Sequence, residues 1–85
     1  MKPYEVRFTG EARKDVRKLT PKLREKLKAI VSRALAPDPY CGKRLVGDLT
    51  GFFSFRLTYQ DRIVYTVDDR ARVIVIHRAR THYGD

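Results

Sequence analysis

The stretch FFSFRLTYQDRIVYTV, residues 52–67, decides the fold of this chain. Apolar side chains recur at every second position in both of its halves, a period typical of β-strands with one buried face. These side chains belong to Phe53, Phe55, Leu57, Ile63, Tyr65 and Val67. The pattern predicts two paired strands, 53–57 and 62–67, whose aromatic rings share one face, because a slip of one residue would expose them.

The same register brings Arg56 and Arg62 together on the opposite face of this hairpin. Like charges that face each other across two strands are unfavourable unless an anion or an acidic group lies between them. Two interpretations are open at this point. Either the two long side chains diverge into water, or they hold a negatively charged ligand such as a phosphate.

Strand patterns also lie on either side of this hairpin. Residues 4–8 alternate between apolar and polar side chains, which predicts another half-buried strand. Residues 73–77 are apolar on both faces, which favours a central strand, and residues 68–70 form the turn before it. Residues 78–85 are predicted to form a polar tail.

Two helices are predicted between the first strand and the hairpin. Residues 11–19 carry apolar side chains at helical spacing behind Thr9, a suitable N-cap. The second helix begins at Thr20, where a capping hydroxyl precedes a proline, and ends before Pro37. A turn-rich connection follows over residues 37–49.

The order β-α-α-β-β-β predicts an α+β fold. We expect an antiparallel β-sheet with an N-terminal strand and a two-helix hairpin packed on one face. A chain of 85 residues and 9.9 kDa leaves room for a single domain, residues 1–85.

The charge balance points to a polyanionic partner. Nineteen Lys and Arg against ten Asp and Glu give a net charge of +9. Nucleic acid is one such partner and an acidic protein is another, and charge alone does not separate RNA from DNA. No apolar run approaches the roughly 20 residues of a membrane span, and no signal-peptide stretch follows the first methionine. We therefore expect a cytoplasmic protein without membrane contact.

The end of the sequence concentrates side chains that exchange protons or stack on bases. His77 continues an apolar strand, which favours a structural role, whereas His82 is the better candidate for proton transfer. Tyr83 can stack on a base or hydrogen-bond a phosphate, and the alternative for both is a mobile tail. Cys41 is the single cysteine, and no acidic residue neighbours the two histidines at the spacing of metal ligands. We therefore expect no metal site and no cofactor.

Cations beside a histidine and a tyrosine suit transesterification of RNA. In that reaction a base removes the proton of a 2′-hydroxyl, cations hold the charged phosphorane, and an acid protonates the departing 5′-oxygen. No glycine-rich phosphate loop, serine-hydrolase elbow or zinc-protease motif competes with this interpretation.

Two segments of the chain resemble the toxins of the RelE/ParE superfamily, most of all its RelE/YoeB branch. The segments are KRLVGDLTGFFSFRL, residues 43–57, and DRIVYTV, residues 61–67, followed by an acidic turn and the closing pair His82-Tyr83. The resemblance extends over the whole chain. It implies a toxin of a type II toxin–antitoxin system that cleaves mRNA in the ribosomal A site without a metal.

The resemblance also implies roles for particular residues. Arg62 matches the arginine that contacts the scissile phosphate, and His82 matches a histidine that takes part in proton transfer. Tyr83 matches the neighbouring tyrosine that positions or stacks the substrate, and Arg56 falls near a basic position that binds phosphate. Three further arginines are candidates for contacts with RNA or phosphate: Arg44, Arg78 and Arg80.

The general base departs from the YoeB pattern. That branch has a glutamate where this chain has Lys43. Three explanations are open: Lys43 is the base, His82 is the base, or catalysis is weak. A lysine needs a lowered pKa to act as a base near neutral pH, and neighbouring arginines act in that direction.

The implied partners are an acidic antitoxin, mRNA with the ribosome, and operator DNA reached through the antitoxin. Two alternatives remain. One is a ParE-like inhibitor of gyrase with the same fold, against which the His82-Tyr83 pair counts. The other is a non-catalytic basic module that binds nucleic acid or protein.

Overall fold

The stretch that decides the fold forms a hairpin with the predicted register. In the computed structural model, which describes residues 2–79, strands β3 (Phe53–Arg56) and β4 (Arg62–Asp68) are antiparallel. Phe53 lies opposite Tyr65, and Phe55 lies opposite Ile63. Tyr65 and Ile63 are fully buried, so the apolar face of the hairpin is the inner one, as the alternation predicted.

Three further strands complete the sheet in the described part of the chain. β5 (Val73–Arg78) is antiparallel to β4, and β1 (Glu5–Phe8) lies on the far side of β5. β2 (Lys43–Arg44) pairs with β3 inside the segment expected to be a connection. The strand order is β1-β5-β4-β3-β2.

The α+β class is confirmed, with one difference at the edge of the sheet. β1 runs parallel to β5, so the sheet is mixed and not wholly antiparallel. The reason is topological. The two helices carry the chain from β1 to β2 at the opposite edge of the sheet, and the antiparallel strands β2 to β5 then lead back, so that β5 runs alongside β1 in the same direction. β5 lies between β1 and β4, which confirms that its two apolar faces mark a strand inside the sheet.

Both helices begin at the predicted caps. The Thr9 hydroxyl accepts the backbone N–H of Ala12 at 3.1 Å and starts α1 (Gly10–Lys18). The Thr20 hydroxyl does the same for α2 (Pro21–Ile30). α2 continues into a π-helical turn, Val31–Leu35, in which the Ala36 N–H bonds the carbonyl of Val31 at 2.8 Å, and it ends before Pro37.

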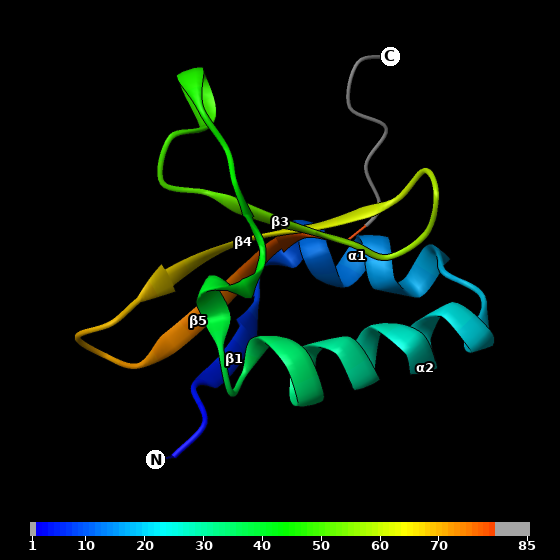
Figure 1. The fold of residues 1–85 in the computed structure, drawn as a ribbon. Coiled ribbons are helices and arrows are strands. Elements are labelled where there is room, and N and C mark those ends of the chain that lie inside the picture. The colour runs from blue at the N-terminus through cyan, green and yellow to red at the C-terminus, as the bar shows by residue number, and fades with distance from the viewer. Residues whose placement is uncertain (1, 80–85) are drawn as a thin grey trace.

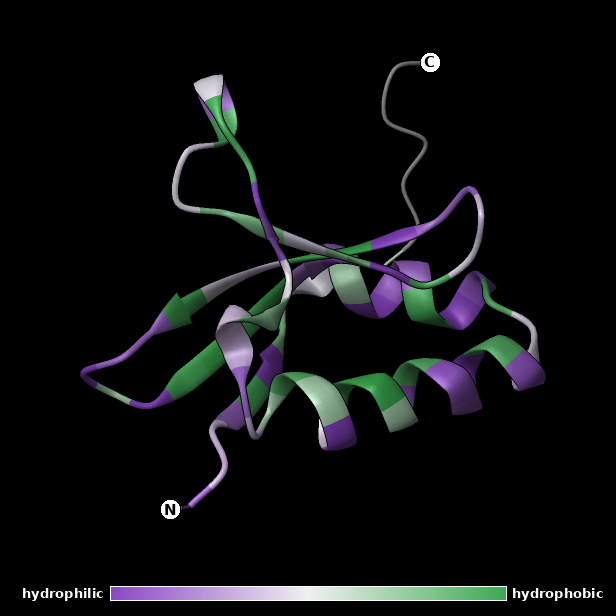
Figure 2. Ribbon diagram, viewed as in Figure 1, coloured by the Kyte–Doolittle hydropathy of each residue, from purple (hydrophilic) through white to green (hydrophobic). Residues whose placement is uncertain are grey.

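The core lies between the helices and one face of the sheet (Figure 1). The largest fully buried side chains come from the sheet, from the residue that follows β3 and from the turn after α2. They are Tyr65, Leu35, Leu57, Ile63, Ile74, Ile76 and Val64. Figure 2 shows a continuous hydrophobic stretch along most of β5, while the helices alternate between hydrophobic and hydrophilic stretches. No helix within residues 2–79 is long and apolar enough to cross a membrane.

Candidate active site

The outer face of the sheet, opposite the helices, carries the predicted arginine pair. Arg56 ends β3 and lies directly opposite Arg62, the first residue of β4. Arg56 is exposed, and Arg62 is partly exposed. The predicted face and pairing of both residues are confirmed, because the buried aromatic residues leave only this register.

A cavity of about 350 Å³ adjoins this pair. Its lining consists of Lys43, Leu45, Leu49, Ser54 and Arg62. Lys43 lies opposite Ser54 in the β2–β3 pair, and Ser54 lies opposite Val64 in the β3–β4 pair. Three adjacent strands therefore form the floor of the cavity, and the following loop supplies its apolar wall.

That loop, residues 45–52, projects from the sheet on the side away from the helices (Figure 1). Its ends are joined by a hydrogen bond from the Leu45 N–H to the Phe52 carbonyl at 2.9 Å. Gly47 and Gly51 have φ values of +69° and +99°, a region that side chains disfavour. The two glycines of the Leu-x-Gly-x-Leu-x-Gly motif therefore allow the turns that place Leu45 and Leu49 at the cavity.

The cavity is electropositive. In the described part of the chain, no carboxylate forms an ion pair with Lys43, Arg56 or Arg62. Ser54 is 2% exposed, and its hydroxyl has no hydrogen-bond partner within residues 2–79. Two cations and an unpaired hydroxyl in one concave site are suited to binding an anion.

His77 lies on the same outer face but has a structural environment. Its Nε2 is 3.0 Å from the hydroxyl of Thr66, and its ring meets the edge of Phe52 with centroids 5.0 Å apart. Partial burial lowers the pKa of His77, so the neutral imidazole prevails at neutral pH. The predicted structural role of His77 is confirmed, since the ring is both packed and hydrogen-bonded.

Arg44 is separated from the cavity although it adjoins Lys43 in sequence. Neighbouring residues of a strand point to opposite faces, and Arg44 pairs with Phe53. Its guanidinium lies 5.6 Å from the centroid of the Phe53 ring, on the inner side of the sheet. The structure therefore does not bring Arg44 together with the other proposed phosphate contacts.

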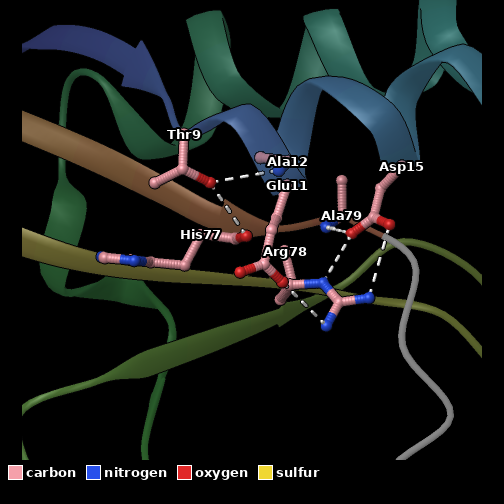
Figure 3. A network of polar contacts seen from close by, with 7 residues as sticks. All are labelled: Thr9, Glu11, Ala12, Asp15, His77, Arg78 and Ala79. Atoms are coloured by element: carbon pink, nitrogen blue, oxygen red, sulfur yellow. Dashed lines mark hydrogen bonds and ion pairs between the residues drawn. The ribbon is translucent and has the colours of Figure 1, made fainter.

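Arg78 is held against α1 by acidic side chains (Figure 3). Its Nε donates to Asp15 Oδ2 at 2.8 Å, and Glu11 lies 3.6 Å from its Nη1. Asp15 is buried, and the same Oδ2 accepts the backbone N–H of Ala79 at 3.1 Å. We call Asp15, Arg78 and Ala79 the α1–β5 clamp; it fixes the end of β5 and does not bring Arg78 to the cavity.

The remaining predicted residues are Arg80, His82 and Tyr83, which lie outside the described residues. Their roles stay predictions. Sequence reasoning missed Ser54 and the two leucines of the cavity wall as site residues. The leucines belong to a motif that was recognised, whereas Ser54 reads as an ordinary polar position of an alternating strand.

A second concave surface lies between the two helices. This interhelical groove, of about 790 Å³, has an apolar floor and a cationic rim. Phe8, Val16, Leu27 and Val31 form the floor, and Arg13, Arg17, Arg24 and Lys28 form the rim. Within residues 2–79, no three His, Cys, Asp or Glu side chains are grouped so that they could hold a metal ion.

The fold agrees with what comparison with known proteins shows. The sequence profile of the ParE-like toxins of type II bacterial toxin–antitoxin systems matches residues 6–83. The chain belongs to this family, and so to the RelE/ParE superfamily of toxins.

Among its relatives is the toxin RelG of Mycobacterium tuberculosis, 43% identical over 81 residues, which cover 89% of this chain and 87% of RelG. The toxin–antitoxin complex RelBE2 of the same organism contains a chain with a TM-score of 0.85 and 37% identity, covering 100% of this chain and 97% of that one. The YoeB–YefM complex of Staphylococcus aureus gives a TM-score of 0.68 and 29% identity, covering 94% and 98%. The chain is therefore a type II toxin of the RelE/YoeB kind.

Proposed function

We propose that this toxin is an endoribonuclease that cleaves mRNA in the ribosomal A site and so inhibits translation. The observation that carries the proposal is the cavity in which Lys43 and Arg62 converge beside Arg56. A phosphodiester supplies the negative charge that this arrangement lacks, and a guanidinium can donate two parallel hydrogen bonds to it.

The proposed reaction is an attack within the RNA itself. The 2′-oxygen bonds to the adjacent phosphorus, its proton passes to a base, and the 5′-oxygen leaves with a proton from an acid. The products are a 2′,3′-cyclic phosphate and a free 5′-hydroxyl. Arg62 stabilises the charge that develops on the phosphorane, and the protein groups take the place of a metal.

Lys43 and His82 are the two candidates for the base, and the one that is not the base is available as the acid. Lys43 lines the cavity, so it has the geometric access that a base requires. Tyr83 is proposed to position the substrate. A pH–rate profile of Lys43→Ala and His82→Gln assigns the roles, because removal of the base abolishes the acidic limb of the profile.

We further propose a cytoplasmic antitoxin partner that binds the interhelical groove. The RelBE2 and YoeB–YefM structures are toxin–antitoxin complexes. The apolar floor and four-cation rim of the groove fit an amphipathic helix with acidic flanks. An Arg13→Glu, Lys28→Glu double variant is expected to bind the antitoxin more weakly, with unchanged cleavage in its absence. Operator DNA would be reached through that antitoxin.

The decisive experiment compares the wild-type protein with two variants in a ribosome-dependent cleavage assay with a defined mRNA. Arg62→Ala is expected to lower the rate about 100-fold or more, the usual effect of removing a group that stabilises transition-state charge. Arg70→Ala is the matched control, because it removes the same charge beyond the other end of β4. A 2′-deoxy substitution at the cleaved nucleotide should abolish cutting.

Other outcomes favour the alternatives. Growth arrest with DNA damage and intact mRNA would support a ParE-like inhibitor of gyrase. Expression without arrest would support a non-catalytic basic module. Full activity of Arg62→Ala would refute the proposed site.

A further inference from the structure

The Ser54 side chain is exceptional among the buried polar groups of the described chain. Its Oγ is shielded from water, and it has no hydrogen-bond partner. The buried hydroxyl of Tyr65, by contrast, donates to the Pro39 carbonyl at 2.8 Å. Buried hydroxyls nearly always find a partner, because burial without one costs free energy.

The surroundings of Ser54 indicate what its partner is. Ser54 lines the same cavity as Lys43 and Arg62 and lies directly opposite Lys43 in the sheet. The strands on both sides, paired at Lys43 and Val64, hold its backbone in place. A hydroxyl in a cavity lined by two cations is suited to donate to a negatively charged oxygen.

We propose that the Ser54 side chain turns into the cavity when RNA binds at Lys43 and Arg62, and that its hydroxyl then donates a hydrogen bond to a phosphate oxygen. This inference rests on the proposed function and adds a substrate-binding residue to it. Leu45 and Leu49 close the opposite wall of the cavity, where the apolar face of a ribose can pack. The hydroxyl is thus unpaired in the free protein because its partner arrives with the substrate.

The inference predicts opposite effects on stability and on activity. If the hydroxyl serves only the substrate, Ser54→Ala removes an unpaired polar atom, and the melting temperature of the protein stays the same or rises. Cleavage in the ribosome-dependent assay falls about 10-fold to 100-fold, the range for a lost hydrogen bond to a charged group. A structural serine would instead lower the melting temperature when it is removed.

Ser32→Ala is the matched control, because the Ser32 hydroxyl lies on the helical side and bonds the carbonyl of Lys28 at 2.8 Å. Ser54→Cys, nearly the same size but a weak donor, is expected to lose activity as Ser54→Ala does. Cleavage by Ser54→Ala within twofold of wild type would overturn the inference, and so would a clear loss of thermal stability.

Inorganic phosphate separates this inference from the proposed function. If the wild-type protein does not cut mRNA, the proposed function fails. The role of Ser54 in binding phosphate is then tested only by the stabilisation that inorganic phosphate gives. Stabilisation of the wild type by phosphate that Ser54→Ala and Arg62→Ala lack would support the inference. Equal stabilisation of the wild type and Ser54→Ala, or none of either, would overturn it.

Discussion

The α1–β5 clamp allows a quantitative test of how the fold is held at the end of β5. Asp15→Ala removes the carboxylate that accepts from Arg78 Nε at 2.8 Å and from the Ala79 N–H at 3.1 Å. Ala79 is fully buried, so its N–H would lose its partner without gaining water. Arg78 is 42% exposed along its side chain and is hydrated again when Asp15 is absent.

These two contacts contribute unequally. A hydrogen bond from a buried N–H to a carboxylate is worth about 1.5–3 kcal/mol. The half-exposed ion pair adds about 0–1 kcal/mol because solvent screens it. Asp15→Ala is therefore expected to cost about 1.5–4 kcal/mol. At about 4–8 °C per kcal/mol for a domain of this size, the melting temperature falls by roughly 6–32 °C.

Thermal unfolding followed by circular dichroism measures this shift, with Glu11→Ala as the control. Glu11 contacts the same arginine at 3.6 Å but is 76% exposed, so its removal should change stability by about 0.5 kcal/mol or less. Equal shifts for the two variants would refute the reasoning, since they would mean that burial of Asp15 does not strengthen the clamp.

Three further predictions concern other parts of the chain. Gly42→Ala should lower the melting temperature by about 5 °C or more, measured in the same assay, because the new Cβ would lie 2.2 Å from the Tyr65 hydroxyl. The hydrogen bond to Asp69 raises the pKa of Tyr40 to about 12, so the stability that it contributes is complete below pH 10 and is lost between pH 10 and about 12. In Tyr40→Phe, the free energy of unfolding should therefore fall less steeply with pH in that window, and a slope equal to that of the wild type would contradict this. Arg56→Ala should reduce the slope of log affinity for single-stranded RNA against log salt by about 0.7, as titrations at several salt concentrations would detect, while an unaltered slope would exclude Arg56 as a phosphate contact.

Much of the fold follows from the sequence because local patterns and global packing agree. The alternation in residues 52–67 admits one register with buried aromatics, and that register also placed Arg56 opposite Arg62. Threonine caps fixed both helix starts. The direction of β1 could not be predicted, because alternation identifies a strand without giving its neighbour or its orientation.

The site was predicted only in part for a related reason. β2 has two residues, too few to show a period, so the opposite orientations of Lys43 and Arg44 were not visible in the sequence. Ser54 is identified as a cavity residue only by the three-dimensional arrangement of the strands and the loop around it. The contact of Arg78 with Asp15 joins residues 63 positions apart, beyond the reach of any local pattern.

The parallel pairing of β1 with β5 has a consequence for how the newly synthesised chain folds. Within residues 2–79, β1 hydrogen-bonds to no strand other than β5, although almost the whole described chain separates them. During synthesis, β1 has no strand to pair with until residues 73–78 have left the exit tunnel of the ribosome. Closing so distant a contact is slow. The chain therefore completes this sheet only after β5 has been made, late in its folding.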